Sequence, residues 1–313
     1  MTIRALAVGV HVLDIHVRHV ESIPSGSDGA LVDQIRMSAA GTAGGTALVL
    51  AKLGVDVSSV GAVGDDPLGR VLRELLAEQG VDVSGLVSKG EVQSSASVLP
   101  VRPDGDRPAW HCIGANDAFS LDDVDLDAVA AADVVLLGGP EVLGGDAAAK
   151  LLEHARAHGT VTAVDMLAPG EPDLLEWVGA ALPHADYFLP NDEQLLGLTG
   201  ASTLEEAAAA LLDRGVGCVA ATCGAAGALV AVADGAEGTT TVPAFEVDVV
   251  DTTGCGDAFT AGFLTGVLGG RTPQEAAVLG NATAAQVVQG LGTDHGTFDL
   301  AAVEAFAAAT PRR

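Results

Sequence analysis

Residues 249–259 read VVDTTGCGDAF and carry the strongest signal in this 313-residue chain. An apolar run enters a Gly-X-Gly turn at Gly254–Gly256, and apolar residues then recur at helical spacing at Phe259, Phe263 and Val267. This pattern predicts a strand, a glycine loop and a helix. The unpaired amides at a helix N-terminus bind anions, and glycine lets the backbone approach an anion closely. The stretch therefore predicts an anion-binding loop.

Asp257 lies on the first turn of the predicted helix, where a carboxylate would repel a bound phosphate. We therefore interpret Asp257 as the group that faces the hydroxyl of a second substrate, while the amides of Gly254, Cys255 and Gly256 form an anion hole. The arrangement indicates phosphoryl transfer. We also expect the helix N-terminus to lower the pKa of Asp257. The loop is no P-loop, since no Gly-Lys-Ser/Thr follows, and it lacks the dinucleotide fingerprint Gly-X-Gly-X-X-Gly.

The loop resembles the Asp-Thr-X-Gly-Ala-Gly-Asp signature of the ribokinase-like carbohydrate kinases, the PfkB family, with Cys255 in place of the alanine. A second segment, residues 40–54, reads AGTAGGTALVLAKLG and is similar to the family's N-terminal Gly-Gly-Thr-Ala-Ala-Asn pattern. The resemblance extends from Gly9 to about Asn281. It implies an α/β fold, namely a three-layer α/β/α sandwich with a mostly parallel central sheet and a small β-sheet lid. It also implies an ATP-dependent kinase that phosphorylates a hydroxyl of a small sugar.

The resemblance implies a substrate site at Asp14, Gly41, Gly45, Glu141 and Asp257. Asp14 is expected to bind two hydroxyls of the acceptor, and Asp257 to act as the catalytic base. Gly45 stands where relatives carry an Asn that bonds a sugar hydroxyl, so we expect a gap of several heavy atoms there. Such a gap predicts weak discrimination at that hydroxyl, because only a site that hydrogen-bonds a hydroxyl strongly rejects analogues that lack it.

On the nucleotide side, residues 190–194 read PNDEQ and resemble the family's Asn-X-X-Glu motif, which handles phosphate and magnesium-bound water. Gln194 takes the place of the Glu. This substitution keeps a hydrogen-bonding side chain but removes its negative charge. Asp251 and Thr253 match residues that hold a monovalent cation beside the anion loop. The implied cofactors are ATP, Mg²⁺ and K⁺. The resemblance further implies that ATP contacts Asn191, Thr222, Gly224, Gly227 and Asn281.

Strand-like runs alternate with helical patterns along most of the chain, which predicts a mostly parallel sheet covered on both faces. Segments 11–40 and 94–113 break this alternation, and we expect them to form the β lid, with a polar turn at 102–108. No linker separates a second domain, so we interpret residues 1–313 as one kinase domain. Capping boxes are predicted at Ser202-X-X-Glu205 and Thr272-Pro273-X-Glu275. Strands are predicted at 55–63, 133–137, 161–165, 187–189 and 218–222, and helices at 68–79, 145–158, 192–199 and 203–214.

The composition excludes several classes of protein. A net charge of −27 with only three lysines argues against a nucleic-acid partner, because that binding requires cations that neutralise phosphates. No apolar run reaches the ~20 residues that a membrane helix needs, and polar residues interrupt the apolar N-terminus, unlike a signal peptide. The four cysteines lack metal-ligand spacing, so we expect reduced thiols and a cytoplasmic location. The oligomer that we consider is a homodimer through the lid.

Alternative functions stay open at this point. A nucleoside kinase of the same fold is one, because Gly45 enlarges the acceptor site and Trp110 has a ring that can stack on a base, whereas Glu141 favours a sugar. A non-catalytic homologue that senses a sugar or nucleotide is the other, because Gly45 and Gln194 depart from the family pattern. A sugar-phosphate kinase is less favoured, because the arginines are scattered along the sequence at Arg36, Arg102 and Arg107.

Overall fold

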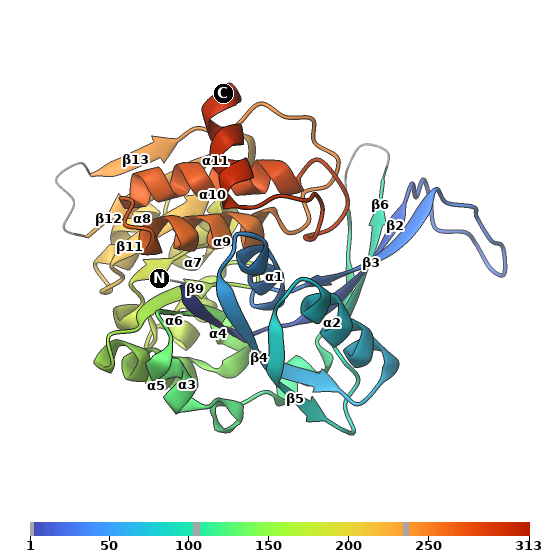
Figure 1. The fold of residues 1–313 in the computed structure, drawn as a ribbon, viewed down its shortest axis with the longest axis horizontal. Helices are drawn as coiled ribbons and strands as arrows, with labels where there is room; N and C mark the ends of the chain where they lie inside the picture. The colour runs from blue at the N-terminus through green and yellow to red at the C-terminus, as the bar shows by residue number, and fades with distance from the viewer. Residues whose placement is uncertain (1–2, 103–106, 234–237) are drawn as a thin grey trace.

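Apolar strands and the helices between them build a nine-stranded sheet with helices on both faces (Figure 1). The computed structural model describes residues 3–102, 107–233 and 238–313. Within the described residues, seven neighbouring strands run parallel to one another. At one edge of the sheet, β12 pairs antiparallel with β11, and β13 pairs antiparallel with β12. In sheet order the strands are β13 (Thr239–Val242), β12 (Ala228–Val232), β11 (Cys218–Thr222), β10 (Tyr187–Phe188), β9 (Val161–Asp165), β8 (Val134–Gly138), β1 (Arg4–Gly9), β4 (Asp56–Gly64) and β5 (Asp82–Lys89).

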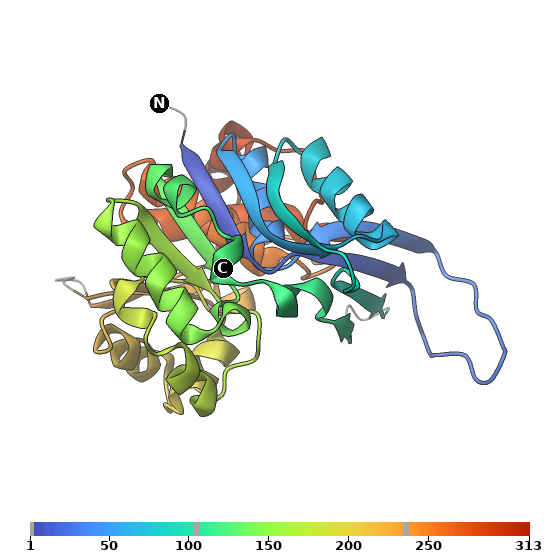
Figure 2. The ribbon, with the colours of Figure 1, turned by 90° about the horizontal axis from the view of Figure 1, so that it is seen from below.

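Two hydrophobic clusters, one on each face of the sheet, form the core. Figure 2 shows the two groups of helices on opposite sides of the strands. One group packs on the first cluster: α1 (Gly44–Lys52), α2 (Pro67–Glu78), α9 (Cys255–Leu268), α10 (Pro273–Val287) and α11 (Leu300–Ala309). The other group packs on the second: α3 (Leu126–Ala131), α4 (Pro140–Leu143), α5 (Gly145–Ala157), α6 (Pro172–Val178), α7 (Asp192–Thr199) and α8 (Leu204–Leu212).

Helix α9, which carries Asp257, lies in tight contact with α10. A Cβ atom at Gly262 would lie 2.4 Å from Thr283 Oγ1, and one at Gly280 would lie 2.7 Å from a ring carbon of Phe259. Glycine at both positions therefore lets the two helices approach closely. With aromatic residues at only 3% of the chain, such close packing of small side chains replaces bulky rings in fixing α9.

A separate four-stranded sheet forms the lid and projects from one side of the body (Figure 1). Its strands come from the two segments that the sequence predicts, although residues 103–106 of the predicted turn lie outside the described part of the chain. Asp14 lies inside the second strand of the chain. In order, the lid strands are β3 (Gln34–Ala40), β2 (Val12–Arg18), β6 (Ala96–Val101) and β7 (Trp110–Cys112).

Two local predictions need correction. The apolar run before the anion loop is not a strand, because the amides of Val250 and Asp251 both donate to the carbonyl of Val288 at the end of α10. The capping box predicted at Ser202 and Glu205 does not form. Thr203 caps α8 instead by accepting a hydrogen bond from the amide of Glu206 at 3.2 Å.

The second capping box is confirmed, since Thr272 and Glu275 bond reciprocally at the start of α10. Among the described residues no single helix is both long and apolar enough to cross a membrane. Helices α7 and α8 together meet that criterion by length and composition, but the pair is bent by 65°.

Candidate active site

The carboxyl ends of the parallel strands and the N-terminus of α9 converge on one cavity of about 210 Å³, which we call the loop cavity. Strands β9 and β11 each end at a residue on its wall, Asp165 and Thr222. This is the edge where open α/β sheets bind ligands. The wall consists of Thr42, Arg107, Asp165, Met166, Leu167, Leu189, Asn191, Gln194, Thr222, Thr252, Gly254, Gly256 and Asp257.

The two loop glycines serve different purposes. Gly254 caps α9 with φ at 75°, and a Cβ atom there would lie 2.2 Å from Thr293 Oγ1. It is therefore required by the fold of the turn. A Cβ atom at Gly256 would meet nothing within 4 Å, and Gly256 lines both the loop cavity and the cavity beside it. Gly256 thus keeps the space above the helix N-terminus open.

Asp257 is half-buried at the start of α9, and its pKa is raised to about 7. Burial is the main cause, because it disfavours the charged form, and the charge of Asp14 adds to it while Arg107 opposes it. Our expectation that the helix terminus lowers this pKa is therefore wrong. The removal of water around the carboxyl group outweighs the helix dipole. A base with a pKa near neutrality accepts a proton more readily than an ordinary Asp.

The gap expected at Gly45 is already filled. A Cβ atom at Gly45 would lie 2.2 Å from Asp257 Oδ2 and 2.7 Å from Asp257 Cγ. The carboxylate of Asp257 therefore packs directly on the backbone of α1, and Gly45 provides room for the proposed base rather than for a larger substrate. The sequence hid this contact, because 212 positions separate the two residues (257 minus 45).

Asp14 approaches the site from the lid. It is buried on β2, and its register partners on the neighbouring strands are Ser38 and Ser97. Its pKa is raised to about 6, chiefly by burial, while the Ser97 hydrogen bond and the charge of Arg107 lower it. Gly41, also predicted to bind substrate, has φ at 89° and lies against the carbonyl of Val10, so the turn into α1 already requires glycine there.

Glu141 and Asp165 add two buried carboxyl groups to this region. Glu141 Oε1 accepts hydrogen bonds from the amides of Leu167 and Ala168 at 2.7 and 2.6 Å, whereas its buried Oε2 has no partner. Asp165 accepts a hydrogen bond from Thr260 Oγ1 at 3.3 Å, and burial together with the charge of Asp257 raises its pKa well above the usual value. Oε2 of Glu141 thus keeps unused hydrogen-bonding capacity, although Glu141 is not among the residues that line the loop cavity.

A second cavity of about 330 Å³, which we call the apolar cavity, adjoins the loop cavity through Thr222, Thr252 and Gly256, which line both. Gly227 has φ at 97°, and a Cβ atom there would lie 2.0 Å from Val242 O, so it allows a close approach of two backbones. Six predicted site residues line this cavity together with Phe245, Val247, Phe259 and Val288: Thr222, Gly224, Gly227, Cys255, Gly256 and Asn281.

Two amide side chains predicted to serve the nucleotide and its metal are used within the protein. Gln194 Oε1 accepts from the amide of Asn191 at 2.9 Å, and Gln194 Nε2 donates to the carbonyls of Met166 and Ala168. Gln194 therefore holds the 166–168 segment against α7, and its amide has little capacity left for a metal-bound water. Asn281 similarly donates from Nδ2 to two backbone carbonyls, which leaves its Oδ1 for a ligand.

Asp251 lies behind the loop, completely buried. Its Oδ1 accepts from the amide and hydroxyl of Thr253, and its Oδ2 accepts from the amide of Gly292 at 3.1 Å. Oδ2 is also 3.6 Å from Nδ1 of the buried His16, and this nitrogen has no hydrogen-bond partner, whereas Nε2 of the same ring bonds Ser38 Oγ. Burial lowers the pKa of His16, so its ring is neutral near neutral pH and does not compensate the charge of Asp251.

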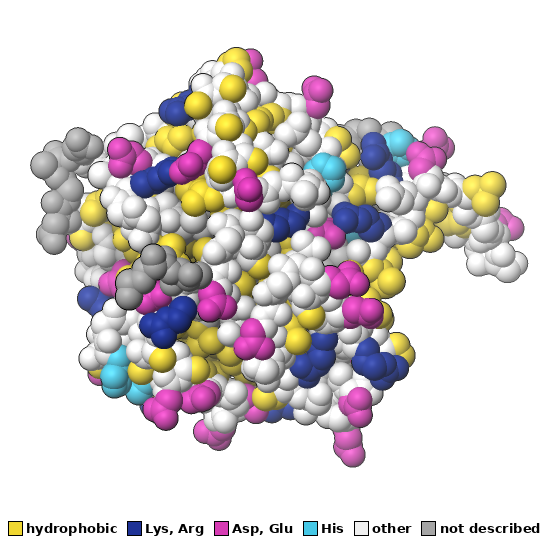
Figure 3. All heavy atoms as spheres, viewed as in Figure 1, with side chains coloured by type: hydrophobic (Ala, Val, Ile, Leu, Met, Phe, Trp, Pro, Cys, Tyr) yellow, Lys and Arg dark blue, Asp and Glu magenta, His cyan; other side chains and the backbone are white. Residues whose placement is uncertain are grey.

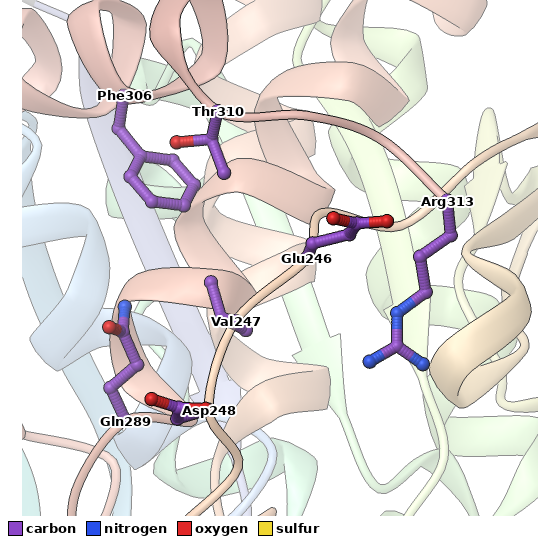
Figure 4. A pocket seen from close by; sticks show the side chains of 7 residues that line it. All are labelled: Glu246, Val247, Asp248, Gln289, Phe306, Thr310 and Arg313. Carbon is purple, nitrogen blue, oxygen red and sulfur yellow. The ribbon is translucent and has the colours of Figure 1, made fainter.

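A larger and more open hollow of about 610 Å³ adjoins the apolar cavity near the C-terminal helix (Figure 4). It contains none of the predicted site residues. Val247 and Arg313 line both this hollow and the apolar cavity. The hollow is lined by Glu246, Val247, Asp248, Gln289, Phe306, Thr310 and Arg313.

Comparison with known proteins matches residues 7–299 to the model of the pfkB family carbohydrate kinases. The chain belongs to this family. The pfkB fold is shared with an Arabidopsis thaliana ribokinase solved in complex with ribose and ATP, at a TM-score of 0.83 and 25% identity over 98% of this chain and 99% of that one. The chain is therefore a sugar kinase of the pfkB type.

Two relatives illustrate the range of acceptors in pfkB kinases. An ATP-dependent ribose-1-phosphate kinase from Halopiger xanaduensis is 32% identical over 270 residues, which cover 84% of each chain. A nucleoside kinase from Methanothermobacter thermautotrophicus is 27% identical over 294 residues, which cover 92% of this chain and 90% of the relative.

The two loop glycines should respond differently to substitution. We expect Gly256→Val to abolish ATP turnover with little change in Tm, because its side chain enters open space that a phosphate would occupy. Gly254→Val should lower Tm, because the new side chain strains the turn and overlaps Thr293. Thermal unfolding and ATP turnover of both variants test this. Wild-type turnover in a folded Gly256→Val protein would contradict the role of the loop.

Gly45→Ala should lower kcat by about 10²-fold with little change in the KM for ATP, because the new methyl group forces the Asp257 carboxylate out of position. Gly90→Ala serves as the control, because a Cβ atom at Gly90 meets nothing within 4 Å. Steady-state kinetics of the two variants provide the measurement. Equal kcat values for Gly45→Ala and wild type would show that the contact with Asp257 does not matter for turnover.

Proposed function

We propose that this kinase transfers the γ-phosphoryl group of ATP to a hydroxyl of a small sugar, with Asp257 as the general base. One observation carries the proposal: a half-buried Asp with a pKa near neutrality lies at the helix N-terminus on the wall of the loop cavity. The position meets the two needs of phosphoryl transfer, which are donors for the phosphoryl oxygens and an acceptor for the hydroxyl proton.

The two cavities suit the two substrates. The apolar cavity suits an adenosine group, because Phe245, Val247 and Phe259 supply apolar surface and Asn281 a polar atom. ATP phosphates would then extend past Thr222 and Gly256 into the loop cavity, where the amides of residues 254–257 face the transferring group. Asp257 orients the acceptor hydroxyl and takes its proton as the new O–P bond forms.

Magnesium would enter with ATP and reduce the negative charge on its phosphates. The described residues contain no cluster of three or more His, Cys, Asp or Glu that could hold a metal ion. We therefore expect a magnesium ion at this site to be coordinated mainly by phosphate oxygens and water. Asn191 and Gln194 line the cavity where such waters would lie, although Gln194 is largely committed to protein contacts.

The acceptor site follows from the carboxyl groups that surround Asp257. We propose that Asp14 on the lid and the unpartnered Oε2 of Glu141 bind acceptor hydroxyls, because carboxylates accept hydrogen bonds from diols. Nucleosides remain the second candidate class, supported by the nucleoside kinase among the relatives. Sugar phosphates form the third, supported by the ribose-1-phosphate kinase.

We further propose a potassium ion beside Asp251 and Thr253, which would compensate the buried charge of Asp251 next to the neutral His16. Hydrogen bonds from the amide and hydroxyl of Thr253 orient the Asp251 carboxylate. Turnover should rise when K⁺ replaces tetramethylammonium at constant ionic strength. Identical rates in the two salts would overturn this proposal.

A homodimer through the lid is also proposed. Its support is the apolar surface on the lid, visible as yellow atoms on the projecting segment in Figure 3. The exposed large hydrophobic residues of the lid are Ile23, Leu31, Ile35, Met37 and Trp110. A cytoplasmic location is proposed as well, in keeping with four cysteines that are all free thiols.

The proposed function is tested with a panel of sugars, nucleosides and sugar phosphates, each supplied with Mg-ATP. We expect ADP release with at least one sugar, and Asp257→Asn should lower kcat by about 10²–10⁴-fold, because the amide cannot accept the proton. Asp213→Asn, an exposed acid at the end of α8, is the control and should leave kcat unchanged. No ADP release with any acceptor would contradict a catalytic role, and full activity of Asp257→Asn would exclude this residue as the base.

A further inference from the structure

Arg107 reaches the anion loop from the lid. It lies in the connection between β6 and β7, and its Nε donates to Thr252 Oγ1 at 3.1 Å. The same nitrogen lies 3.6 Å from Asp251 Oδ1. Thr252 lies two residues before Gly254, and Arg107 lines the same cavity as Gly254 and Gly256, so the lid brings a guanidinium group close to the loop. Sequence reasoning missed this placement, because nothing in the local sequence around Arg107 indicates where the lid folds.

The charges around the loop cavity give Arg107 a distinct position. Among the described residues that line this cavity it is the only Lys or Arg, whereas Asp165 and Asp257 are acidic. Burial raises the pKa values of Asp14 and Asp257, and the charge of Arg107 acts against that rise at both groups. Phosphate oxygens that enter among these carboxyl groups meet repulsion, which a guanidinium close to the loop offsets.

The side chain of Arg107 is about one-third exposed, at 34%. Partial exposure keeps the guanidinium accessible from the cavity, while the bond to Thr252 limits where it can lie. A planar guanidinium binds phosphoryl oxygens through two parallel N–H donors. The geometry therefore combines a cation, access to the cavity and proximity to the amides that face the same oxygens.

We propose that Arg107 is a catalytic residue that binds the phosphoryl group during transfer, from the lid side of the loop cavity. The proposal rests on the proposed function. In the step, the bond between the γ-phosphorus and the β–γ bridging oxygen breaks, and the acceptor oxygen bonds to that phosphorus. The proton of the acceptor passes to Asp257, ADP leaves with the bridging oxygen, and Arg107 keeps its proton and its charge. Arg107 contributes by stabilising the negative charge on the oxygens of the phosphoryl group during transfer.

This assignment links the two substrates through one element. The lid carries Arg107 beside the loop, and its strand β2 carries Asp14, the proposed acceptor ligand. A phosphate already present on an acceptor would also suit a guanidinium, as in a sugar phosphate. If Arg107 bound a phosphate of the acceptor, its substitution would weaken acceptor affinity and would not impair the stabilisation of the transferring phosphoryl group.

The test compares binding of Mg-ADP with binding of Mg-ADP plus aluminium fluoride, which mimics the phosphoryl group in transit, by calorimetry. We expect Arg107→Ala to weaken the aluminium fluoride complex by about 10²–10³-fold, the usual loss for one donor to a developing charge, and to leave Mg-ADP affinity unchanged. Arg107→Lys should restore part of that loss. Arg102→Ala, an exposed arginine on the same lid connection, is the matched control and should match wild type.

Turnover with the best neutral sugar and with ribose 1-phosphate separates the two phosphate sources. The proposal predicts a drop in kcat for both acceptors in Arg107→Ala, with the KM for the neutral sugar unchanged. An effect confined to the KM for ribose 1-phosphate would overturn it, as would wild-type affinity of Arg107→Ala for the aluminium fluoride complex. Failure of the wild-type protein to bind Mg-ADP would instead overturn the proposed function itself.

Discussion

The partial burial of the Asp257 carboxyl group at the N-terminus of α9 is the constraint on which the site depends. Its oxygen lies where a Cβ atom of residue 45 would be, so α1 must present glycine at that point. The close packing of α9 on α10 through Gly262 and Gly280 fixes the helix that carries it. Exclusion of water raises the pKa of Asp257 to about 7, and that shift makes an ordinary carboxyl group an effective base.

The same burial creates an electrostatic difficulty for a protein with a net charge of −27. Asp14, Asp165 and Asp251 are also buried in this region, and a nucleotide adds further negative charge. Two features oppose this accumulation of negative charge. The N-terminus of α9 lines the cavity, and the lid places Arg107 beside it. Few cations in the chain therefore suffice, because their placement matters more than their number.

Local sequence predicted the features that short-range geometry determines. The glycine loop, the helix that follows it, the alternation of strands and helices and the lid segments all depend on neighbouring residues, and family resemblance identified the fold. The errors concern long-range contacts. The pKa of Asp257 depends on burial by distant elements, the space at Gly45 is filled from α9, and Gln194 is occupied by carbonyls of the 166–168 segment. The position of Arg107 beside the loop depends on where the connection between β6 and β7 lies in the folded protein, and spacing in the sequence does not encode that.

The pH dependence of kcat tests the central claim most directly. The pKa of Asp257 is raised from 3.8 to about 7, so the carboxyl group is protonated and inactive as a base below that pH and ionised above it. With saturating Mg-ATP and acceptor, kcat should therefore rise with pH, pass half of its maximum near pH 7 and become constant above about pH 8. A kcat that is already constant from about pH 5 upward would contradict the account, because it would mean that Asp257 keeps the pKa of an ordinary exposed Asp.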